Sequence, residues 1–398
     1  MILLKNANII TMENQCYERG FVVFDTKIRH IGRYGEDTEK YDIDRIIDAG
    51  GKYLIPGLID AHSHIGVCED SVGEDGDDCN EDSDPVTPAV RAIDAVNPFD
   101  RAFSDAKKAG ITTVVTGPGS ANPIGGQFAA IKTHGICVDD MIIKAPAAMK
   151  FALGENPKVV YHGKNQAPVT RMGTAYIIRE ALFKAKEYLE AMERYKEDPD
   201  ENDKPDFDMD CHALADVLQR RIPAKFHAHR GDDICTAIRI AKEFDLDYTI
   251  EHCTDAESVL PVLERENAGI CIGPTFTDRS KTELQALSFD TYKRLGGLTT
   301  AIITDHPETP AEYLPLCAAM AVKHGMDKER ALEAVTINAA KLCRISNRVG
   351  SIKEGKDADF VLCEKLPYEW EFRSYMTIIN GEIVFSVETE GGNQPDGN

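Results

Sequence analysis

Two histidines at the end of an apolar stretch are the first residues in this sequence that could bind a metal. His62 and His64 close the stretch "LIPGLIDAHSHIG", residues 54–66. Residues two apart in a strand face the same side, so both imidazoles project together and can hold one divalent ion. Two satisfied core histidines give the same short pattern, so this pair alone does not decide between the two interpretations.

Three further apolar stretches end in the same way. "AKFHAH" ends in His227 and His229, "DYTIEHC" in His252, and "LTTAIITDHP" in Asp305 and His306. Six of the eleven histidines therefore stand at the ends of expected buried strands. Burying so many imidazoles and a carboxylate without partners is costly, whereas a metal ion supplies the partner. The convergence of four strand ends therefore favours a metal centre over a structural cluster.

The elements that must position these residues alternate between strands and helices. Residues 232–245 and 255–268 have apolar side chains at helical spacing, and a short strand-like stretch follows each of them. This alternation predicts an α/β fold with parallel strands buried on both faces. Residues 56–345 have the length of a (β/α)8 TIM-type barrel, which needs about 250 residues. Between Gly117 and Lys150 we expect strands but no evident helix, so eight units cannot be counted cleanly.

Both ends of the chain have the pattern of short strands separated by turns. The first fifty residues alternate apolar and polar side chains between glycines, and Asn380-Gly381 marks a hairpin near the other end. Two β-rich ends around a different middle predict one small domain built from residues 1–55 and 346–390. The barrel then takes residues 56–345, and residues 391–398 form a flexible tail.

The composition narrows the class of protein. The 398 residues are 42% hydrophobic and 28% charged, as in soluble globular proteins. The net charge of -22 argues against nucleic acid and anionic membranes and fits a small-molecule or cationic ligand. No apolar stretch approaches the roughly eighteen residues of a spanning helix, and the start lacks a signal-peptide pattern. The eleven scattered cysteines favour reduced thiols in a cytoplasmic protein. Homo-oligomerisation, which is common, is left open.

Two strongly acidic stretches interrupt the alternation of strands and helices. Residues 68–85 follow His64 directly, and a loop after a barrel strand lies at the mouth of the site. Its charge favours a cationic group, although solvation of the rim explains the composition equally well. Its spacing is not that of an EF-hand. Residues 195–210 follow a long charged helix and are interpreted as a solvated excursion.

Taken together, the motifs resemble those of the amidohydrolase superfamily. They are "PGLIDAHSHIG", "KFHAHRGDD", "TIEHC" and "TDHP", with the closing "GSIKEGKDADFVL". The imidazolonepropionase-like and dihydroorotase-like branches are the most similar. The resemblance covers nearly the whole chain and implies a metal-dependent (β/α)8 barrel beside a small β-sandwich from both termini. The ordered motifs are specific to the superfamily and much weaker for any one substrate.

The resemblance also implies roles for individual residues. The metal ligands that it assigns are His62, His64, His227, His252 and Asp305. Asp305 would also shuttle a proton. In two-metal members a carboxylated lysine or a glutamate bridges the ions, and here Lys150 and Glu155 are the candidates. We favour Lys150, because it interrupts an apolar run in which a bare ammonium is expensive to bury. A lysine that reaches outward to solvent or pairs with an acid is the alternative, and a site without a bridge would hold one ion.

Several neighbouring residues are weaker candidates. His229 shares the strand face of a ligand, and we expect it to orient ligands or face the substrate. Asp232 and His306 are candidates for orienting ligands. The segment 117–135 lacks the dinucleotide fingerprint and is expected to form loops near the substrate. Within it, Asn122 and Gln127 are candidate substrate contacts, and a structural role is at least equally expected.

The reaction that fits these residues is hydrolysis of a C–N bond in an amide, cyclic amide or peptide-like substrate. One or two divalent ions, zinc by default, would activate water, and Asp305 would pass its proton to the leaving nitrogen. A deaminase on the same scaffold would use one metal and no lysine bridge. A non-hydrolytic isomerase or decarboxylase and a non-catalytic scaffold are further alternatives, and the intact ligand set speaks against the scaffold. The substrate itself is not specified by the sequence.

Overall fold

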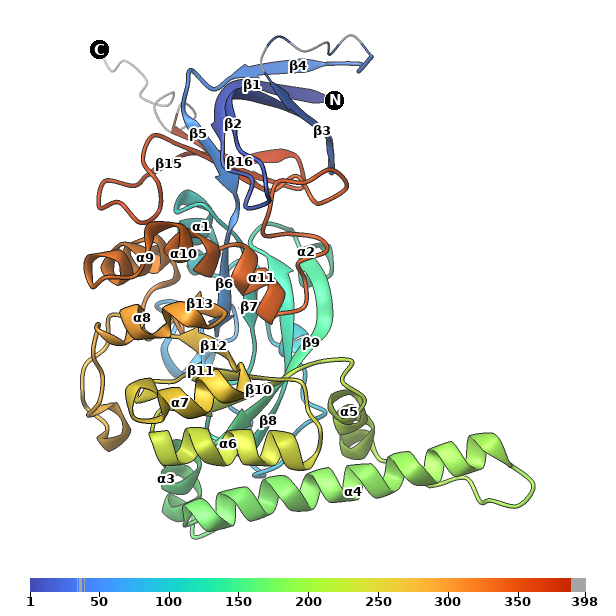
Figure 1. The fold of residues 1–398 in the computed structure, drawn as a ribbon. Helices are drawn as coiled ribbons and strands as arrows, with labels where there is room; N and C mark the ends of the chain where they lie inside the picture. Colours follow the sequence, from blue (N-terminus) through green and yellow to red (C-terminus); the bar gives the residue numbers. More distant parts are fainter. Residues whose placement is uncertain (34, 36–37, 39, 388–398) are drawn as a thin grey trace.

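The computed structural model describes residues 1–33, 35, 38 and 40–387. The predicted tail at 391–398 lies outside these residues. Figure 1 shows a body of strands and helices, a β-rich part at the end that contains the N-terminus, and a long helix that projects from the body. The body carries the strand ends that the motifs mark.

An eight-stranded sheet forms the centre of the body, in the order β13-β12-β11-β10-β9-β8-β7-β6. Its strands are β6 (Leu58–Ser63), β7 (Ile111–Thr116), β8 (Ile124–Lys132), β9 (Ile142–Ala152), β10 (Ala224–Ala228), β11 (Tyr248–His252), β12 (Gly269–Ile272) and β13 (Thr300–Ile302). The two edges meet just beyond β13, where Asp305 N donates to His62 O at 3.1 Å and His64 N donates to His306 O at 2.9 Å. The sheet therefore curves into a nearly closed barrel, and the predicted α/β barrel class is confirmed.

One strand of the barrel runs against the others. β8 is antiparallel to both β7 and β9, whereas all other neighbouring pairs in this sheet are parallel. Only residues 117–123 join β7 to β8, and a parallel return needs a crossover of a dozen or more residues. This short link is why no crossover helix lies between β7 and β8; between Gly117 and Lys150 the structure has only the single-turn helix α2 (Val138–Met141), which the sequence reasoning did not expect.

Helices cover the outside of the barrel. They are α1 (Arg101–Lys108), α2 (Val138–Met141), α3 (Glu155–Gly163), α4 (Arg171–Glu197), α5 (Met209–Leu218), α6 (Gly231–Glu243), α7 (Ala256–Glu266), α8 (Thr291–Arg294), α9 (Leu314–Lys323), α10 (Lys328–Ala334) and α11 (Ile337–Leu342). Short 3-10 turns lie at Gly73–Gly76, Ala92–Asp94, Thr282–Leu284, Leu295–Gly297 and Ala311–Tyr313. In α6, Ile234, Ala237, Ile238 and Ala241 are buried, which is the apolar stripe expected of a helix that packs on a sheet. None of the described helices is both long and apolar enough to cross a membrane.

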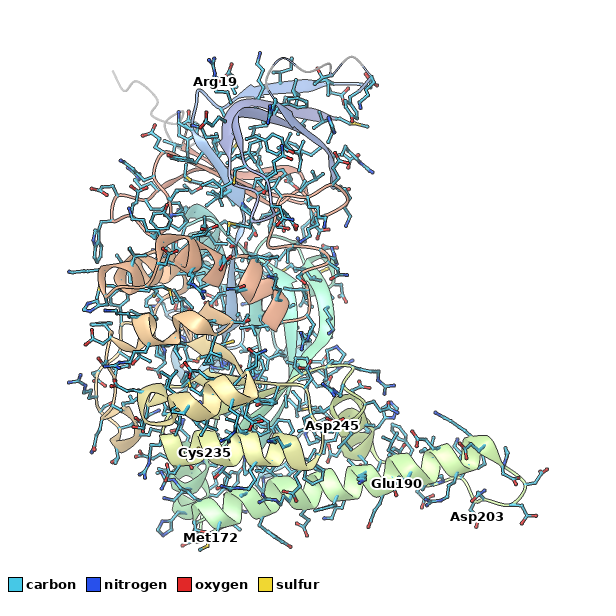
Figure 2. The ribbon with its side chains drawn as sticks, in the orientation of Figure 1. Arg19, Met172, Glu190, Asp203, Cys235 and Asp245 are labelled. Carbon is cyan, nitrogen blue, oxygen red and sulfur yellow. The ribbon has the colours of Figure 1, made fainter. Side chains whose placement is uncertain are left out.

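The long helix α4 reaches well beyond the barrel. Its buried residues end at Ala185, so its last three turns lie outside the packed body. Figure 2 shows Glu190 and Asp203 on this projecting part, and both side chains are exposed. The acidic stretch at 195–210 continues from this end of the helix, as expected for a solvated excursion.

The strands of both termini join in a second sheet, in the order β16-β15-β14-β5-β1-β2-β3 with β4 paired to β1. They are β1 (Ile2–Ile9), β2 (Tyr17–Phe24), β3 (Ile28–Arg33), β4 (Arg45–Asp48), β5 (Tyr53–Pro56), β14 (Phe360–Cys363), β15 (Ser374–Ile379) and β16 (Glu382–Ser386). Leu4, Phe24, Phe360 and Ile378 share one buried core within it. The strands form one continuous hydrogen-bonded sheet, and the exact ranges of the two domains stay a prediction.

Candidate metal centre

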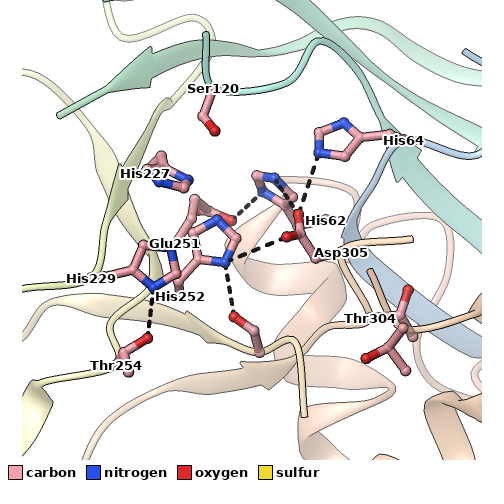
Figure 3. Close-up of polar contacts among 12 residues, drawn as sticks. His62, His64, Ser120, His227, His229, Glu251, His252, Thr254, Thr304 and Asp305 are labelled. Atoms are coloured by element: carbon pink, nitrogen blue, oxygen red, sulfur yellow. Dashed lines mark hydrogen bonds and ion pairs between the residues drawn. The ribbon is translucent and has the colours of Figure 1, made fainter. Parts of the chain in front are cut away.

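Six ligand-type side chains meet at the carboxyl ends of the barrel strands (Figure 3). In each of two groups, ligand atoms lie within 4.8 Å of one another, and the groups are His62, His64 and Asp305, and His227, His229 and His252. Asp305 joins the two groups. Its Oδ1 stands 3.3 Å from His64 Nε2 and 3.6 Å from His62 Nε2, and its Oδ2 stands 3.9 Å from His252 Nδ1. Residues more than 240 positions apart in the sequence therefore share one centre.

Two of the histidines are oriented by backbone carbonyls. His64 Nδ1 donates to Gly117 O at 2.7 Å, and His252 Nδ1 donates to Gly273 O at 2.8 Å. A carbonyl only accepts, so each Nδ1 carries the proton and each Nε2 keeps its lone pair. Gly273 has a φ of +151°, and a Cβ there would stand 2.2 Å from Ile303 O, so only glycine presents this carbonyl without strain.

Buried side chains orient two more histidines. His62 Nδ1 donates to Glu251 Oε2 at 2.7 Å, and His229 Nδ1 is hydrogen-bonded to Thr254 Oγ1 at 2.7 Å. Glu251 is itself buried and receives Lys225 Nζ at 2.9 Å. A carboxylate behind a ligand histidine fixes the ring and raises its basicity as a ligand. Our sequence reasoning missed Glu251, although a glutamate inside the apolar stretch "TIEHC" was the available signal.

Glu251, and not the neighbouring histidine, holds the regular inward position on β11. Glu251 pairs in register with His227 of β10, and register partners in a parallel sheet share a face. His252 would then face the other way in a regular strand. Its φ of +71° lies in the left-handed region, which a non-glycine residue enters at a cost of about 1–3 kcal/mol. This backbone turn brings the His252 ring to within 4.4 Å of the His227 ring, measured between centroids.

The buried imidazoles fit a divalent metal ion. Burial lowers the pKa of His62, His227 and His252 well below the ordinary value of about 6.5, and lowers the pKa of His229 to about 4. All four rings are therefore neutral at pH 7. Within the described part of the chain, both ring nitrogens of His227 and Nε2 of His252 are buried without a hydrogen-bond partner. Leaving such atoms bare costs about 1–3 kcal/mol each, and a metal ion can bind the unprotonated nitrogen of each neutral ring.

Lys150 is the lysine that the fold brings to this centre. It is fully buried on β9, and its Nζ lies 3.1 Å from His62 Nε2. Burial lowers the pKa of this amine to about 8. Glu155, the other candidate bridge, lies at the start of α3, where its carboxylate accepts from Glu283 N at 3.3 Å and its backbone N donates to the Glu283 carboxylate at 2.9 Å.

Glu283 is a further acidic group that our sequence reasoning missed. It is 1% exposed, and its Oε1 stands 3.8 Å from both His227 Nε2 and His229 Nε2. That oxygen has no hydrogen-bond partner among the described residues, whereas Oε2 accepts from Glu155 N at 2.9 Å. Glu283 comes from the long loop between β12 and β13. No sequence pattern around it predicts this position, because only the path of the loop carries it to the histidines.

Two of the predicted orienting residues lie elsewhere. Asp232 is exposed and forms a two-bond ion pair with Arg230, at 2.9 and 3.0 Å. His306 is buried, but its Nδ1 accepts from Ala311 N at 3.2 Å and its Nε2 faces Asp70 Oδ1 at 3.7 Å. The structure therefore directs both side chains to partners outside the two ligand groups.

The segment 117–135, expected to form loops, is in large part the strand β8, and the loop at 117–123 contributes a different residue from those expected. Asn122 accepts from the Tyr161 hydroxyl at 2.7 Å, and Gln127 donates to Pro88 O at 3.1 Å, so both brace surrounding loops. Ser120 instead lines the cavity above the centre and accepts from Asn156 at 2.7 Å. Figure 3 shows its hydroxyl pointing towards the group of histidines.

A cavity of about 360 Å³ opens above the ligand groups. Its walls include His64, Ser120, His227, His229, Lys281 and Asp305. This volume lies within the range of small-molecule sites. The centre therefore faces a space in which a small substrate could reach the histidines and Asp305.

Comparison with known proteins identifies a family model and relatives that match most of the chain. The sequence model of the Amidohydrolase family matches residues 53–384. The chain is 31% identical over 349 residues to the amidohydrolase tasK of Hapsidospora irregularis, covering 81% of this chain and 35% of that protein. It is 25% identical over 395 residues to an adenine deaminase of Clostridium perfringens, covering 97% and 59%. The chain thus spans about a third and three fifths of the lengths of these two relatives.

A solved structure shares the whole fold. An amidohydrolase from Thermotoga maritima MSB8 is 41% identical, with a TM-score of 0.91. The likeness covers 97% of this chain and 100% of that one, so the barrel and the terminal sheet are both included.

Proposed function

The chain belongs to the amidohydrolase family, and from this premise we propose that it is a metal-dependent hydrolase. Its substrate would be a small molecule with an amide, cyclic amide or peptide-like C–N bond. The observation that carries the proposal is the centre itself, where five histidines and Asp305 converge and two rings keep bare nitrogens. A purely structural cluster would pair these atoms, because buried polar groups in native proteins nearly always have partners.

The proposal assigns one or two divalent ions to these residues, with zinc as the usual choice for imidazole ligands. A bound ion of this kind lowers the pKa of water and polarises a carbonyl oxygen. Lys150 supports a two-ion site, because its amine lies beside His62 Nε2 and a carboxylated lysine could bridge ions there. Its pKa of about 8 leaves part of the amine neutral near pH 7, and the neutral amine is the form that reacts with carbon dioxide.

Asp305 is the proposed proton shuttle. Burial alone would raise its pKa, but the nearby His252 and His64 hold the pKa at about 2, so the carboxylate is ionised at neutral pH. Its side chain is 13% exposed and lines the cavity. It can therefore accept a proton from the attacking water and deliver it to the leaving nitrogen. Ser120 and Lys281 lie in the same wall and are available to hold the substrate.

A deaminase is the second candidate, because one relative is an adenine deaminase. That reaction would release ammonia from an amino group instead of splitting an amide. It would need one ion and no lysine bridge. The position of Lys150 beside His62 favours the hydrolase.

The test combines metal counting with a substrate panel. The protein is loaded with Zn²⁺ and assayed on N-acyl amino acids, dipeptides, cyclic amides and adenine, with separate detection of new carboxylates and ammonia. We expect carboxylate release, about two ions at the histidine centre of the wild type, and fewer there in Lys150→Ala, with the exposed Lys186→Ala as the control. Ammonia release alone, or failure to bind any divalent ion, would contradict the proposal.

A further inference from the structure

A second cluster of ligand-type side chains stands apart from the histidines. Cys68, Asp77 and Cys79 offer two sulfurs and a carboxylate oxygen that all lie within 4.8 Å of one another. The Cys68 thiol donates to Asp77 Oδ1 at 3.6 Å. On a tetrahedral zinc ion, with Zn–S near 2.3 Å and Zn–O near 2.0 Å, a sulfur and an oxygen stand about 3.5 Å apart. The thiol and the carboxylate are therefore already at the separation of two ligands on one ion.

The backbone holds these three residues in place. Cys68 and Asp77 form an antiparallel bridge, flanked by hydrogen bonds from Glu69 N to Gly76 O at 2.8 Å and from Asp78 N to Val67 O at 2.9 Å. The acidic stretch after His64 thus begins as a tight hairpin whose two arms end in the two cysteines. An ion would meet preorganised ligands and would not have to order the loop.

Two further bonds fix the hairpin to the barrel. Cys68 N donates to His64 O at 2.9 Å, and Cys79 O accepts from Gly119 N at 2.8 Å. All three residues of the cluster line the same cavity of about 360 Å³ as His64 and Asp305. The cluster is therefore a distinct group of ligands beside the histidine centre, at the wall of the space that a substrate would enter.

We propose that Cys68, Asp77 and Cys79 bind a soft divalent cation of the zinc class. Two thiolates select zinc or cadmium over magnesium, calcium or manganese, which prefer oxygen ligands. Three protein ligands leave the fourth tetrahedral position for water or for a substrate group, as in sites that keep an open position. The bound ion also clamps the hairpin at the cavity wall. The inference rests on this cluster alone and does not depend on the proposed reaction.

Another thiol in the chain serves as a matched control. The Cys137 thiol donates to Asp140 at 3.4 Å, so it reproduces the contact between a thiol and a carboxylate. Cys137 is exposed and belongs to none of the ligand groups within the described residues. If any thiol near a carboxylate bound zinc, this pair would do so as well.

The test counts ions and observes the thiolates directly. Protein stripped of metal under a reductant is titrated with Cd²⁺, and the ultraviolet thiolate-to-cadmium absorption band is recorded; zinc-loaded samples are then analysed for metal content. We expect the band in the wild type and in Cys137→Ser. Cys68→Ser/Cys79→Ser should lose the band and one equivalent of zinc. Asp77→Asn should keep the band and bind more weakly, on the order of tenfold.

Two results would overturn the proposal. One is an equal zinc content in the wild type and the double cysteine variant, with no cadmium band in the wild type. The other is a disulfide between Cys68 and Cys79 in protein purified under reductant, detected as a loss of two hydrogens by mass spectrometry. The wild-type band does not depend on how well any variant folds, so a poorly folded variant leaves the test decisive.

Discussion

Two clusters of ionisable groups in the described part of the chain differ in how their atoms are partnered. Near the junction of the two sheets, Lys132 at the end of β8 pairs with Asp357 at 2.9 Å and also with Asp359. Lys27 and Arg348 complete the cluster, at 2.5 and 2.8 Å from Asp357. In the centre above the barrel, by contrast, nitrogens of His227 and His252 have no partner among the described residues.

The contrast teaches how a structural cluster is told apart from a candidate binding site. Both clusters remove polar or charged groups from water, and this burial costs free energy unless each group has a hydrogen-bond, ion-pair or metal partner. At the junction, positive and negative side chains compensate one another inside the chain. In the centre, His252 is held by its Nδ1 while its Nε2 has no partner, and neither ring nitrogen of His227 has one among the described residues, so the compensation must come from something that binds.

The largest expected effect tests whether the centre is catalytic. Asp305→Asn keeps the shape of the side chain but cannot accept a proton. We expect the turnover number to fall by about 10²–10⁴-fold on the substrate that the panel identifies, with the fold retained. The measurements are steady-state kinetics and circular dichroism, and Asp232→Asn, at an exposed ion pair, is the control. Full turnover in Asp305→Asn would remove the proposed proton transfer.

The next effect tests whether the junction cluster is structural. Lys132→Met removes the buried cation that faces Asp357 and Asp359. Because two carboxylates then lose a buried partner, we expect the free energy of unfolding to drop by about 3–5 kcal/mol. Urea denaturation measures the drop. Lys353→Met, whose side chain is 61% exposed, should cost no more than about 1 kcal/mol. Equal stability of the two variants would contradict the assigned role.

A smaller effect tests whether Glu251 increases the affinity of the centre for zinc. Glu251→Gln keeps the size of the group but weakens its hold on the His62 ring. We expect the affinity for zinc, measured by competition with a chelator, to fall by about 10–100-fold. Glu257→Gln, which changes an exposed carboxylate in the same way, is the control. Unchanged zinc affinity in Glu251→Gln would show that the carboxylate does not tune the ligand.

The smallest expected effect is a pH dependence of the free energy of unfolding, caused by Asp357 at the junction. Burial alone would raise the pKa of Asp357, but the charge of Lys132 and bonds from Lys27 and Arg348 hold it at about 2. The unfolded value is about 3.9, so the unfolded chain binds more protons between these values and the stabilisation is lost as pH falls from about 4 towards 2. The difference corresponds to roughly 2–3 kcal/mol.

Denaturation of the wild type and Asp357→Asn across this range measures that effect. The wild type should be the more stable protein above about pH 4, and the gap between the two should narrow as the pH falls. A gap that stays constant with pH would mean that Asp357 does not contribute through its charge.

Much of the centre followed from residue types and spacing. His62 and His64 stand two apart at the end of an apolar strand, and alternation alone puts them on one side. The strand-rich character of both ends and the barrel class also followed, because hydrophobic periodicity is a local property of the chain. The reversed direction of β8 was not predicted. The sequence indicated only that no evident helix follows β7, because the link between β7 and β8 is short.

Other parts were decided by tertiary structure alone. Glu283 reaches the histidines through the path of a long loop, and His252 reaches them through a left-handed backbone turn. The approach of Cys68 to Asp77 and Cys79 depends on a hairpin in which Cys68 and Asp77 form an antiparallel bridge across an acidic stretch. Sequence patterns record the local preferences of strands and helices. The meeting of residues far apart in the chain depends on how those elements pack and on where the loops between them run, and only the folded structure decides that.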